Sequence, residues 1–282
     1  GLVALSIVSL TVAGCGSGGD GGSSAPVASV TTGGSLGSGT PTGTDAPRFA
    51  YVTNTDENTI SMYVVNAVSG QLRSLGYVLS GLYPFSIAVE PSGRFAYVAN
   101  QSDSLSTYAI NSTTGTLTAV GTIAAGPLPM SVTVDPSGRF VYVANETSNN
   151  VSVFRINGST GALTAVSAPV AVGTNPVSVT VDSSGRFAYA VNQGANTVSV
   201  LAINGTTGAL TTVGAPIAAG TSPISISVDP SGQRAYVANF GSNNLSAFTI
   251  DGSTGALTAL GTFVDGSPVS APYSISTSGV LQ

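Results

Sequence analysis

The sequence predicts an all-β fold, a β-propeller built of four-stranded antiparallel blades. The first observation is a repeat: the string GRFAYVAN at 93–100 returns with small changes, and its tyrosine recurs every 45 to 47 residues. A period of this length with short alternating strands is typical of propeller blades. The second observation is that no segment shows the 3.6-residue apolar period of a helix. The recurring tyrosines are Tyr51, Tyr97, Tyr142, Tyr189 and Tyr236.

Each repeat contains four strand signals, which we name A to D in chain order. In the second repeat they are PFSIAV at 84–89, RFAYVAN at 94–100, LSTYAIN at 105–111 and TLTAVGTI at 116–123. Turns such as DPSG join A to B, with acid, proline and glycine where a type I turn favours them. The acids recur once per repeat, which predicts turn caps rather than a catalytic set. They are Glu90, Asp135, Asp182 and Asp229.

The strand count predicts how the ring closes. The first repeat opens with strand B at 48–54, and a fifth A strand stands at 272–277. Five strands of each kind predict five blades over residues 47–282, with the two chain ends pairing to remove the exposed sheet edges. The serines of the A strands are expected to pack between blades, and a serine-lined ligand channel remains the alternative. They are Ser86, Ser131, Ser178, Ser225 and Ser274.

Residues before the repeats differ in kind. The apolar run GLVALSIVSLTVAGC at 1–15 is typical of an export signal. Its VAGC resembles a bacterial lipobox, which predicts lipidation of Cys15; an ordinary signal peptide with an incidental cysteine is the alternative. Residues 16–46 are rich in Gly, Ser and Thr and predict a disordered tether. We therefore expect an exported lipoprotein, membrane-anchored in the bacterial cell envelope, at the outer membrane or in the periplasm of a Gram-negative host.

Composition excludes several kinds of chemistry. Charged residues make up 7% of the chain, its net charge is −5, and its basic residues are seven arginines with no lysine or histidine. Nucleic acid is therefore not an expected partner, because phosphate binding needs clustered cations. One cysteine and no histidine leave no ligand set for zinc and no base for a Ser–His–acid triad. No catalytic residue and no cofactor is predicted.

The strings AYVTN at 50–54 and AYVAN at 96–100, with the DPSGRF turn and NGSTGALT at 157–164, resemble the YVTN or lactonase-like β-propeller family. The resemblance covers residues 46–282. It implies the propeller fold, with similarity to bacterial 6-phosphogluconolactonases and to carboxymuconate cycloisomerases. It also implies seven blades in the enzymatic members and His or Arg at a site for anionic substrates. Because this chain has five predicted blades and no His or Lys, no catalytic residue is carried over.

Topology predicts two unlike faces. The A–B and C–D turns lie on one, the turn face; the B–C and D–A loops lie on the other, the loop face, where the resemblance implies ligand binding. The seven arginines are expected on the turn face. We predict a lipid-anchored, non-catalytic binding or scaffold module with a protein, peptide or glycan partner on the loop face. A lactonase-type hydrolase and a purely structural or adhesive surface protein are the alternatives. The acids expected on the loop face are Asp56, Glu57, Asp103, Glu146 and Asp265.

Carboxylates with neighbouring amides could hold a hard cation such as Ca²⁺, which takes six to eight oxygen ligands. The candidates are Asp56, Glu57, Asp103 and Glu146. The alternative is that these acids are dispersed around a wide rim and only keep the surface soluble.

Overall fold

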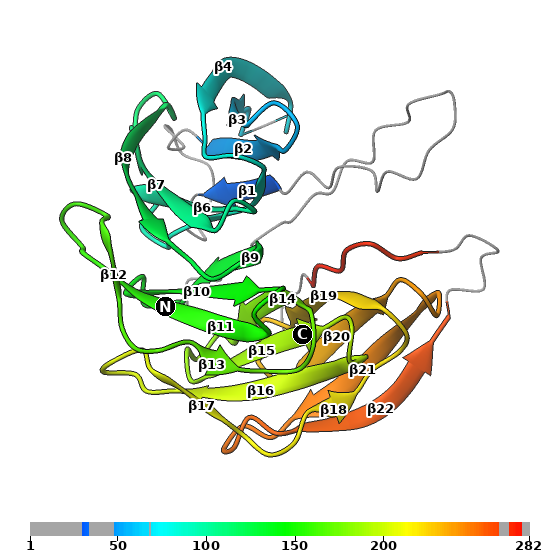
Figure 1. Ribbon diagram of the computed structural model, residues 1–282. Helices are drawn as coiled ribbons and strands as arrows, with labels where there is room; N and C mark the ends of the chain where they lie inside the picture. The colour runs from blue at the N-terminus through cyan, green and yellow to red at the C-terminus, as the bar shows by residue number, and fades with distance from the viewer. Residues whose placement is uncertain (1–29, 34–47, 68, 265–270, 278–282) are drawn as a thin grey trace.

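The computed structural model describes residues 30–33, 48–67, 69–264 and 271–277. In these residues all regular structure is β: 22 strands in five antiparallel sheets, which follow one another around an arc (Figure 1). The order of the strands in every sheet follows the chain. This arrangement confirms the predicted propeller of four-stranded units.

The strands have the following bounds. The first sheet contains β1 (Val30–Gly33), β2 (Arg48–Asn54), β3 (Thr59–Val65) and β4 (Leu72–Leu79), and the second contains β5 (Pro84–Val89), β6 (Phe95–Asn100), β7 (Ser104–Ile110) and β8 (Leu117–Ala124). The third contains β9 (Pro129–Val134), β10 (Phe140–Asn145), β11 (Asn150–Ile156), β12 (Leu163–Ala165) and β13 (Val170–Ala171). The fourth contains β14 (Pro176–Val181), β15 (Phe187–Asn192), β16 (Thr197–Ile203), β17 (Leu210–Thr212) and β18 (Ile217–Ala218), and the fifth contains β19 (Pro223–Val228), β20 (Arg234–Asn239), β21 (Asn244–Ile250) and β22 (Leu257–Phe263).

The outermost strand is continuous in three of the sheets. In the other two sheets it is divided into two short strands. In the third sheet β12 and β13 both pair with β11, and in the fourth β17 and β18 both pair with β16. Pro169 and Pro216 stand immediately before the second pieces. Proline has no N–H to give to the ladder and is confined to edges and irregular positions, so the strand is interrupted there.

The predicted ring of five blades closed by the two chain ends is wrong. The inner partner of β2 is β1, from the range expected to be a tether, and not 272–277. Residues 271–277 instead lie beside β19, where the N–H of Ile275 donates to Ser225 Oγ at 3.2 Å. The N–H of Val132 makes the same bond to Ser86 Oγ between two consecutive inner strands. The last described segment therefore occupies the inner-strand position that follows β19.

The same bonds explain the serines of the inner strands. Ser86, Ser131 and Ser225 each accept an N–H from the next inner strand, at 3.1–3.2 Å. They thus join consecutive sheets near the centre of the arc, which favours the packing interpretation over a serine-lined ligand channel.

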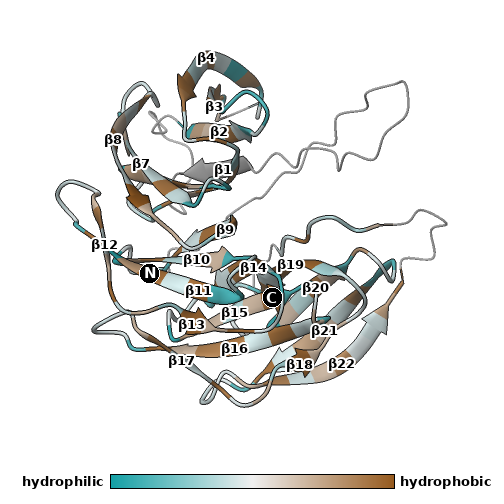
Figure 2. Cartoon of the chain, viewed as in Figure 1, coloured by the Kyte–Doolittle hydropathy of each residue, from teal (hydrophilic) through white to brown (hydrophobic). Residues whose placement is uncertain are grey.

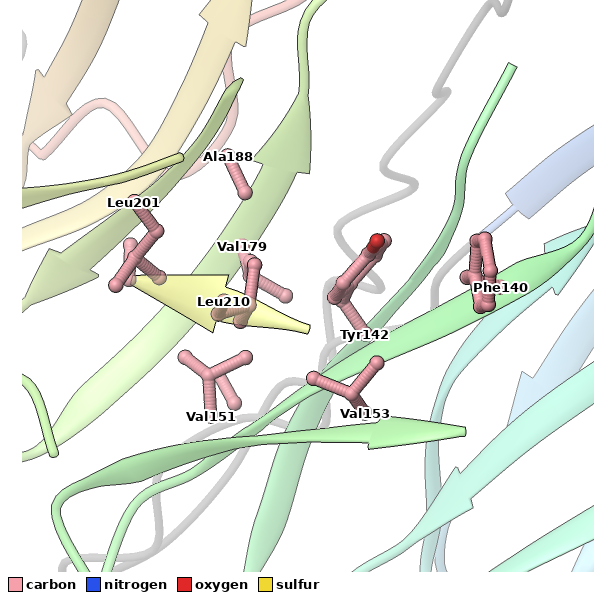
Figure 3. Packing of buried hydrophobic residues seen from close by; sticks show 10 residues of the cluster. Phe140, Tyr142, Val151, Val153, Val179, Ala188, Leu201 and Leu210 are labelled. Carbon is pink, nitrogen blue, oxygen red and sulfur yellow. The ribbon is translucent and has the colours of Figure 1, made fainter. Parts of the chain in front are cut away.

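Apolar side chains fill the space between consecutive sheets, and hydrophobic residues recur along every sheet (Figure 2). Figure 3 shows the cluster between the third and fourth sheets, where Tyr142 and Val153 of one sheet meet Val179 and Leu201 of the other. Removing such side chains from water stabilises the fold by about 1.5–3 kcal/mol each. Each sheet is therefore held mainly by its neighbours in the arc.

Candidate functional site

The tyrosine of the repeated string joins each sheet to the next. Tyr142 is fully buried, and its hydroxyl donates to the carbonyl of Gly208 in the following sheet at 3.2 Å. Burial raises the pKa of this phenol above its ordinary value. The same bond recurs from Tyr51 to Gly115 at 2.8 Å, from Tyr97 to Gly161 at 3.1 Å and from Tyr189 to Gly255 at 3.1 Å.

The phenylalanine two residues earlier packs on the same glycine. A Cβ placed on Gly208 would lie 2.3 Å from Cδ1 of Phe140, and Gly208 has a φ of +80°. Glycine is required there for two reasons, since both the space and the left-handed backbone exclude a side chain. The equivalent pairs are Phe49 with Gly115, Phe95 with Gly161, and Phe187 with Gly255.

The acids of the A–B turns are turn caps, as predicted. Asp135 Oδ1 accepts the N–H groups of Arg139 at 2.8 Å and Phe140 at 2.7 Å. The guanidinium of Arg139 lies 5.4 Å from the centroid of the Phe140 ring, in cation–π geometry. These groups stabilise the turn, and the largely buried carboxylate is poorly placed to act as a base. Glu90, Asp182 and Asp229 cap their own turns in the same way.

The asparagine that ends each B strand is also engaged. Asn145 is fully buried; its Nδ2 donates to Asn150 Oδ1 and Ser152 Oγ, both at 2.8 Å. Its Oδ1 accepts the N–H of Gly126 at 3.1 Å. Asn192 repeats the two donor bonds, but its Oδ1 has no partner among the described residues. The residues that recur in RFAYVAN thus form the structure rather than a site.

On the turn face, a pocket of about 420 Å³ lies between the fourth and fifth sheets. Asp182 and Arg186 line it together with Arg234. Asp182 caps its turn, and Arg186 donates to Ser184 Oγ and to the carbonyl of Gly252. Arg234 donates to the carbonyl of Gln233 at 3.2 Å. All three charged groups of the pocket are therefore already hydrogen-bonded to neighbouring protein groups.

All seven arginines lie toward the turn face, as predicted. Arg48 pairs with Val65 at the C–D end of β2 and β3, and Arg73 and Arg155 pair at the same end of their sheets. The other arginines begin a B strand or lie in the turn before it, and they are Arg94, Arg139, Arg186 and Arg234. In the part of the chain that the structure describes, the loop face therefore has no basic side chain.

On the loop face, each B–C turn is hydrogen-bonded to the next D–A loop. Asn58 has a φ of 55°, and its Oδ1 accepts the N–H of Tyr83 at 2.6 Å. Asp103 takes this position in the second sheet and accepts the N–H of Leu128 at 2.9 Å. The remaining pairs are Asn149 with Asn175, Asn196 with Ser222, and Asn243 with Ala271.

The predicted acids are spread over three sheets. Asp56 and Glu57 are exposed in the turn between β2 and β3, and Asp103 is exposed between β6 and β7. Glu146 Oε1 accepts Asn175 Nδ2 at 3.1 Å in the third sheet. Within the described ranges no group of three or more His, Cys, Asp or Glu side chains is placed to hold a metal ion. The structure therefore does not assemble the four Ca²⁺ candidates, while Asp265 and Cys15 lie outside the described residues.

Sequence reasoning missed the apolar side chains of the loop face. Leu79, Leu82 and Tyr83 are 71%, 57% and 52% exposed beside the first B–C turn. At the other end of the arc Phe240 meets Tyr273 edge to face, with ring centroids 5.6 Å apart. The signal was present in the repeat. The positions of Leu82 and Tyr83 carry Pro127–Leu128, Thr174–Asn175 and Thr221–Ser222 in the next three loops.

Antiparallel sheets that follow one another around an arc, with inner strands joined side by side, define the chain as a β-propeller protein. A family model described as "Lactonase, 7-bladed beta-propeller" matches residues 43–133, 84–181 and 174–272. The chain belongs to this family, whose seven blades further correct the predicted number of five. No curated protein matches the chain.

Solved structures share the fold at low sequence identity. A protein from Bacteroides fragilis, provisionally named a 6-phosphogluconolactonase, is 19% identical with a TM-score of 0.70, over 88% of this chain and 79% of that chain. A protein from Lactobacillus plantarum is 22% identical with a TM-score of 0.70, over 80% and 69%. A functionally unknown protein from Desulfotomaculum acetoxidans is 17% identical with a TM-score of 0.68, over 77% and 67%. At these identities the likeness concerns the fold.

No helix in the described ranges is long and apolar enough to cross a membrane.

Proposed function

We propose that this chain is a non-catalytic binding or scaffold module of the bacterial cell envelope and that its partner binds on the loop face. The observation that carries the proposal is the contrast between the two faces. The repeated acids, tyrosines and asparagines are engaged in turns and sheet junctions. The loop face instead presents exposed apolar side chains beside the exposed acids Asp56, Glu57 and Asp103. Such an exposed apolar patch rimmed by polar groups is typical of an interaction site.

Lactone hydrolysis is the second candidate, and membership of the lactonase family favours it. An anionic sugar substrate on the loop face would meet Asp56 and Glu57 without a basic side chain from the described residues to balance its charge. Like charges in a shared site repel, so the described loop face disfavours a phosphorylated substrate.

Turnover separates the two functions. The purified chain is incubated with glucono-δ-lactone and with 6-phosphogluconolactone, and ring opening is followed against the spontaneous rate. We expect no acceleration. Hydrolysis above background that is lost in the Asp56→Asn, Glu57→Gln variant would establish the lactonase function, and the Asp251→Asn variant on the turn face serves as the control.

We also propose that Cys15 carries the lipid anchor, on the strength of the VAGC string and the Gly- and Ser-rich segment after it. The test is partition of the chain, expressed with its own leader, between detergent and water phases. Cys15→Ser is expected to move the protein out of the detergent phase or to leave the leader uncleaved. Unchanged partition of a processed variant would remove Cys15 as the anchor.

A further inference from the structure

The sharpest departure from the repeat on the loop face lies between the first and second sheets. Leu79, Leu82 and Tyr83 are exposed there, and Asp56, Glu57 and Asp103 stand in the two adjoining B–C turns. We name these six residues the Leu–Tyr patch. We propose that the Leu–Tyr patch binds a positively charged polypeptide segment that carries apolar side chains. This inference rests on the proposed binding function and names its partner class.

The backbone of the patch is fixed on both sides. On one side the N–H of Tyr83 donates to Asn58 Oδ1 at 2.6 Å, and the N–H of Ser80 donates to the Asn58 carbonyl at 2.8 Å. On the other side the N–H of Gln101 donates to the Tyr83 carbonyl at 2.9 Å, and Ser102 Oγ donates to the Leu82 carbonyl at 3.1 Å. The backbone that carries Leu82 and Tyr83 is therefore fixed before a partner arrives, which lowers the backbone entropy lost on binding.

Tyr83 has a backbone conformation that tyrosine rarely adopts. Its φ is 55°, in the left-handed region that asparagine and glycine adopt most readily. Asn175 fills the same position in a later loop, with a φ of 52°. Packing does not explain a tyrosine here, because the side chain is 52% exposed. The equivalent positions are left-handed in every described D–A loop, including at Leu128 and Ser222, so the exposed ring, and not the backbone, distinguishes Tyr83. An exposed aromatic ring at a loop position is a candidate contact for a partner.

Charge decides the class of partner. The two turns that flank Leu82 and Tyr83 carry three exposed carboxylates, and every arginine lies toward the opposite face. The Oδ1 of Asp103 accepts the Leu128 N–H, while no hydrogen bond is present for Asp56 or Glu57 within the described residues. A partner with Lys or Arg next to aliphatic or aromatic side chains complements both properties, whereas an acidic partner is repelled.

The test uses the full chain and two fluorescent peptides, one of alternating arginine and leucine and one of alternating glutamate and leucine. Binding is followed by anisotropy at low and at high salt. We expect the arginine peptide to bind, the glutamate peptide not to bind, and the affinity of the arginine peptide to fall as salt is raised.

Three variants replace patch or control residues with uncharged or repeat-matched ones. Leu82→Thr with Tyr83→Asn introduces the Thr174–Asn175 pair without changing charge, and we expect affinity to fall at least about tenfold, as for anchors in an interface. Asp56→Asn with Glu57→Gln should weaken binding and its salt dependence. The control Asp251→Asn, an exposed acid of a C–D turn where other repeats have Asn157 and Asn204, should leave affinity unchanged.

Thermal unfolding of the Leu82→Thr, Tyr83→Asn variant separates lost binding from lost folding, because asparagine suits the left-handed position and should leave stability equal or higher. Equal binding of both peptides, or equal weakening by Asp251→Asn, would overturn the inference. Failure of the arginine peptide to bind would also overturn the inference, but it would leave the proposed binding function standing. Catalysed lactone hydrolysis would overturn the proposed function itself.

Discussion

The two faces of this propeller are made by the same repeat and differ in how far they follow it. On the turn face, each position repeats its contact: Asp135 caps its turn, Phe140 packs on Gly208, and Asp182 and Phe187 do the same one sheet later. On the loop face the backbone bond repeats, but the side chains at the positions of Leu82 and Tyr83 change from loop to loop. In this molecule the side chains that recur in every repeat are those that pack between the sheets. The positions whose side chains differ from repeat to repeat indicate where a partner could bind.

A second contrast lies between the sheet junctions and the outer faces of the end sheets. Leu117 is 7% exposed at a junction, while its counterpart Leu72 in the first sheet is 53% exposed. Tyr142 is fully buried, while Tyr236 of the fifth sheet is only partly buried. The chain therefore contains matched positions with and without a neighbouring sheet, and substitutions at the positions without one are internal controls.

The largest effect is expected at alkaline pH. Burial raises the pKa of the four junction tyrosines, Tyr51, Tyr97, Tyr142 and Tyr189, above the ordinary value of about 10. Above that value the unfolded chain loses phenolic protons that the folded chain retains, so stability is full below about pH 10 and falls as pH rises further. Urea unfolding at a series of pH values checks this. A stability that stays constant well above pH 10 would contradict the buried junctions.

The next largest effect is expected from Gly208→Ala. The new methyl group meets the Phe140 ring, and the backbone is left-handed, which together should lower the free energy of unfolding by about 3–4 kcal/mol. Gly70→Ala is the matched control, because Gly70 has a φ of +72° and nothing within 4 Å of the added Cβ. Only the backbone effect of about 1–2 kcal/mol should remain there. Equal losses of unfolding free energy in the two variants would show that the contact between Phe140 and Gly208 does not contribute.

Tyr142→Phe tests the hydrogen bond alone. It leaves the carbonyl of Gly208 without its donor, and an unsatisfied buried acceptor lowers stability by about 1–3 kcal/mol. Tyr236→Phe should change stability by less than about 0.5 kcal/mol, since no hydroxyl bond of Tyr236 is present in the described residues. Denaturant midpoints at neutral pH give both values. A larger loss of stability at Tyr236 than at Tyr142 would contradict the role given to the hydrogen bond of Tyr142.

The smallest effect is expected on the loop face. Asp56→Asn with Glu57→Gln should change the unfolding free energy by less than about 0.5 kcal/mol, because both side chains are exposed. Asp135→Ala, on the turn face, removes a cap that accepts three N–H groups and should lower stability by about 1–2 kcal/mol. Similar losses in both variants would mean that the loop acids are structural as well.

The repeat made most of the fold predictable. The B strands ending at Asn100 and Asn145 and the caps at Asp135 and Asp182 could be found because one string recurs in register. Ring closure could not be found in this way. The serine pattern of 272–277 predicts an inner strand that follows β19 whether or not the ring closes. The pairing of β2 with β1 rules out the predicted closure, and it is seen only in the structure.

The loop face was predictable as a surface but not as a patch. The acids could be assigned to loops from the strand order, and the structure then spread them over three sheets. Nothing in the residue types of Leu82 and Tyr83 predicts that they are exposed. Their exposure depends on the fixed backbone between Asn58 and Ser102, which brings together residues far apart in the sequence.

The claim that the loop face binds a partner while the turn face is structural is tested most directly by amide hydrogen exchange. Exchange is measured on the full chain with and without the arginine–leucine peptide. We predict slower exchange on binding in the loop-face segments 55–58, 79–83 and 101–103, with the turn segments 135–139, 182–186 and 229–234 unchanged. Protection of the turn segments without protection of the loop-face segments would contradict the assignment of binding to the loop face.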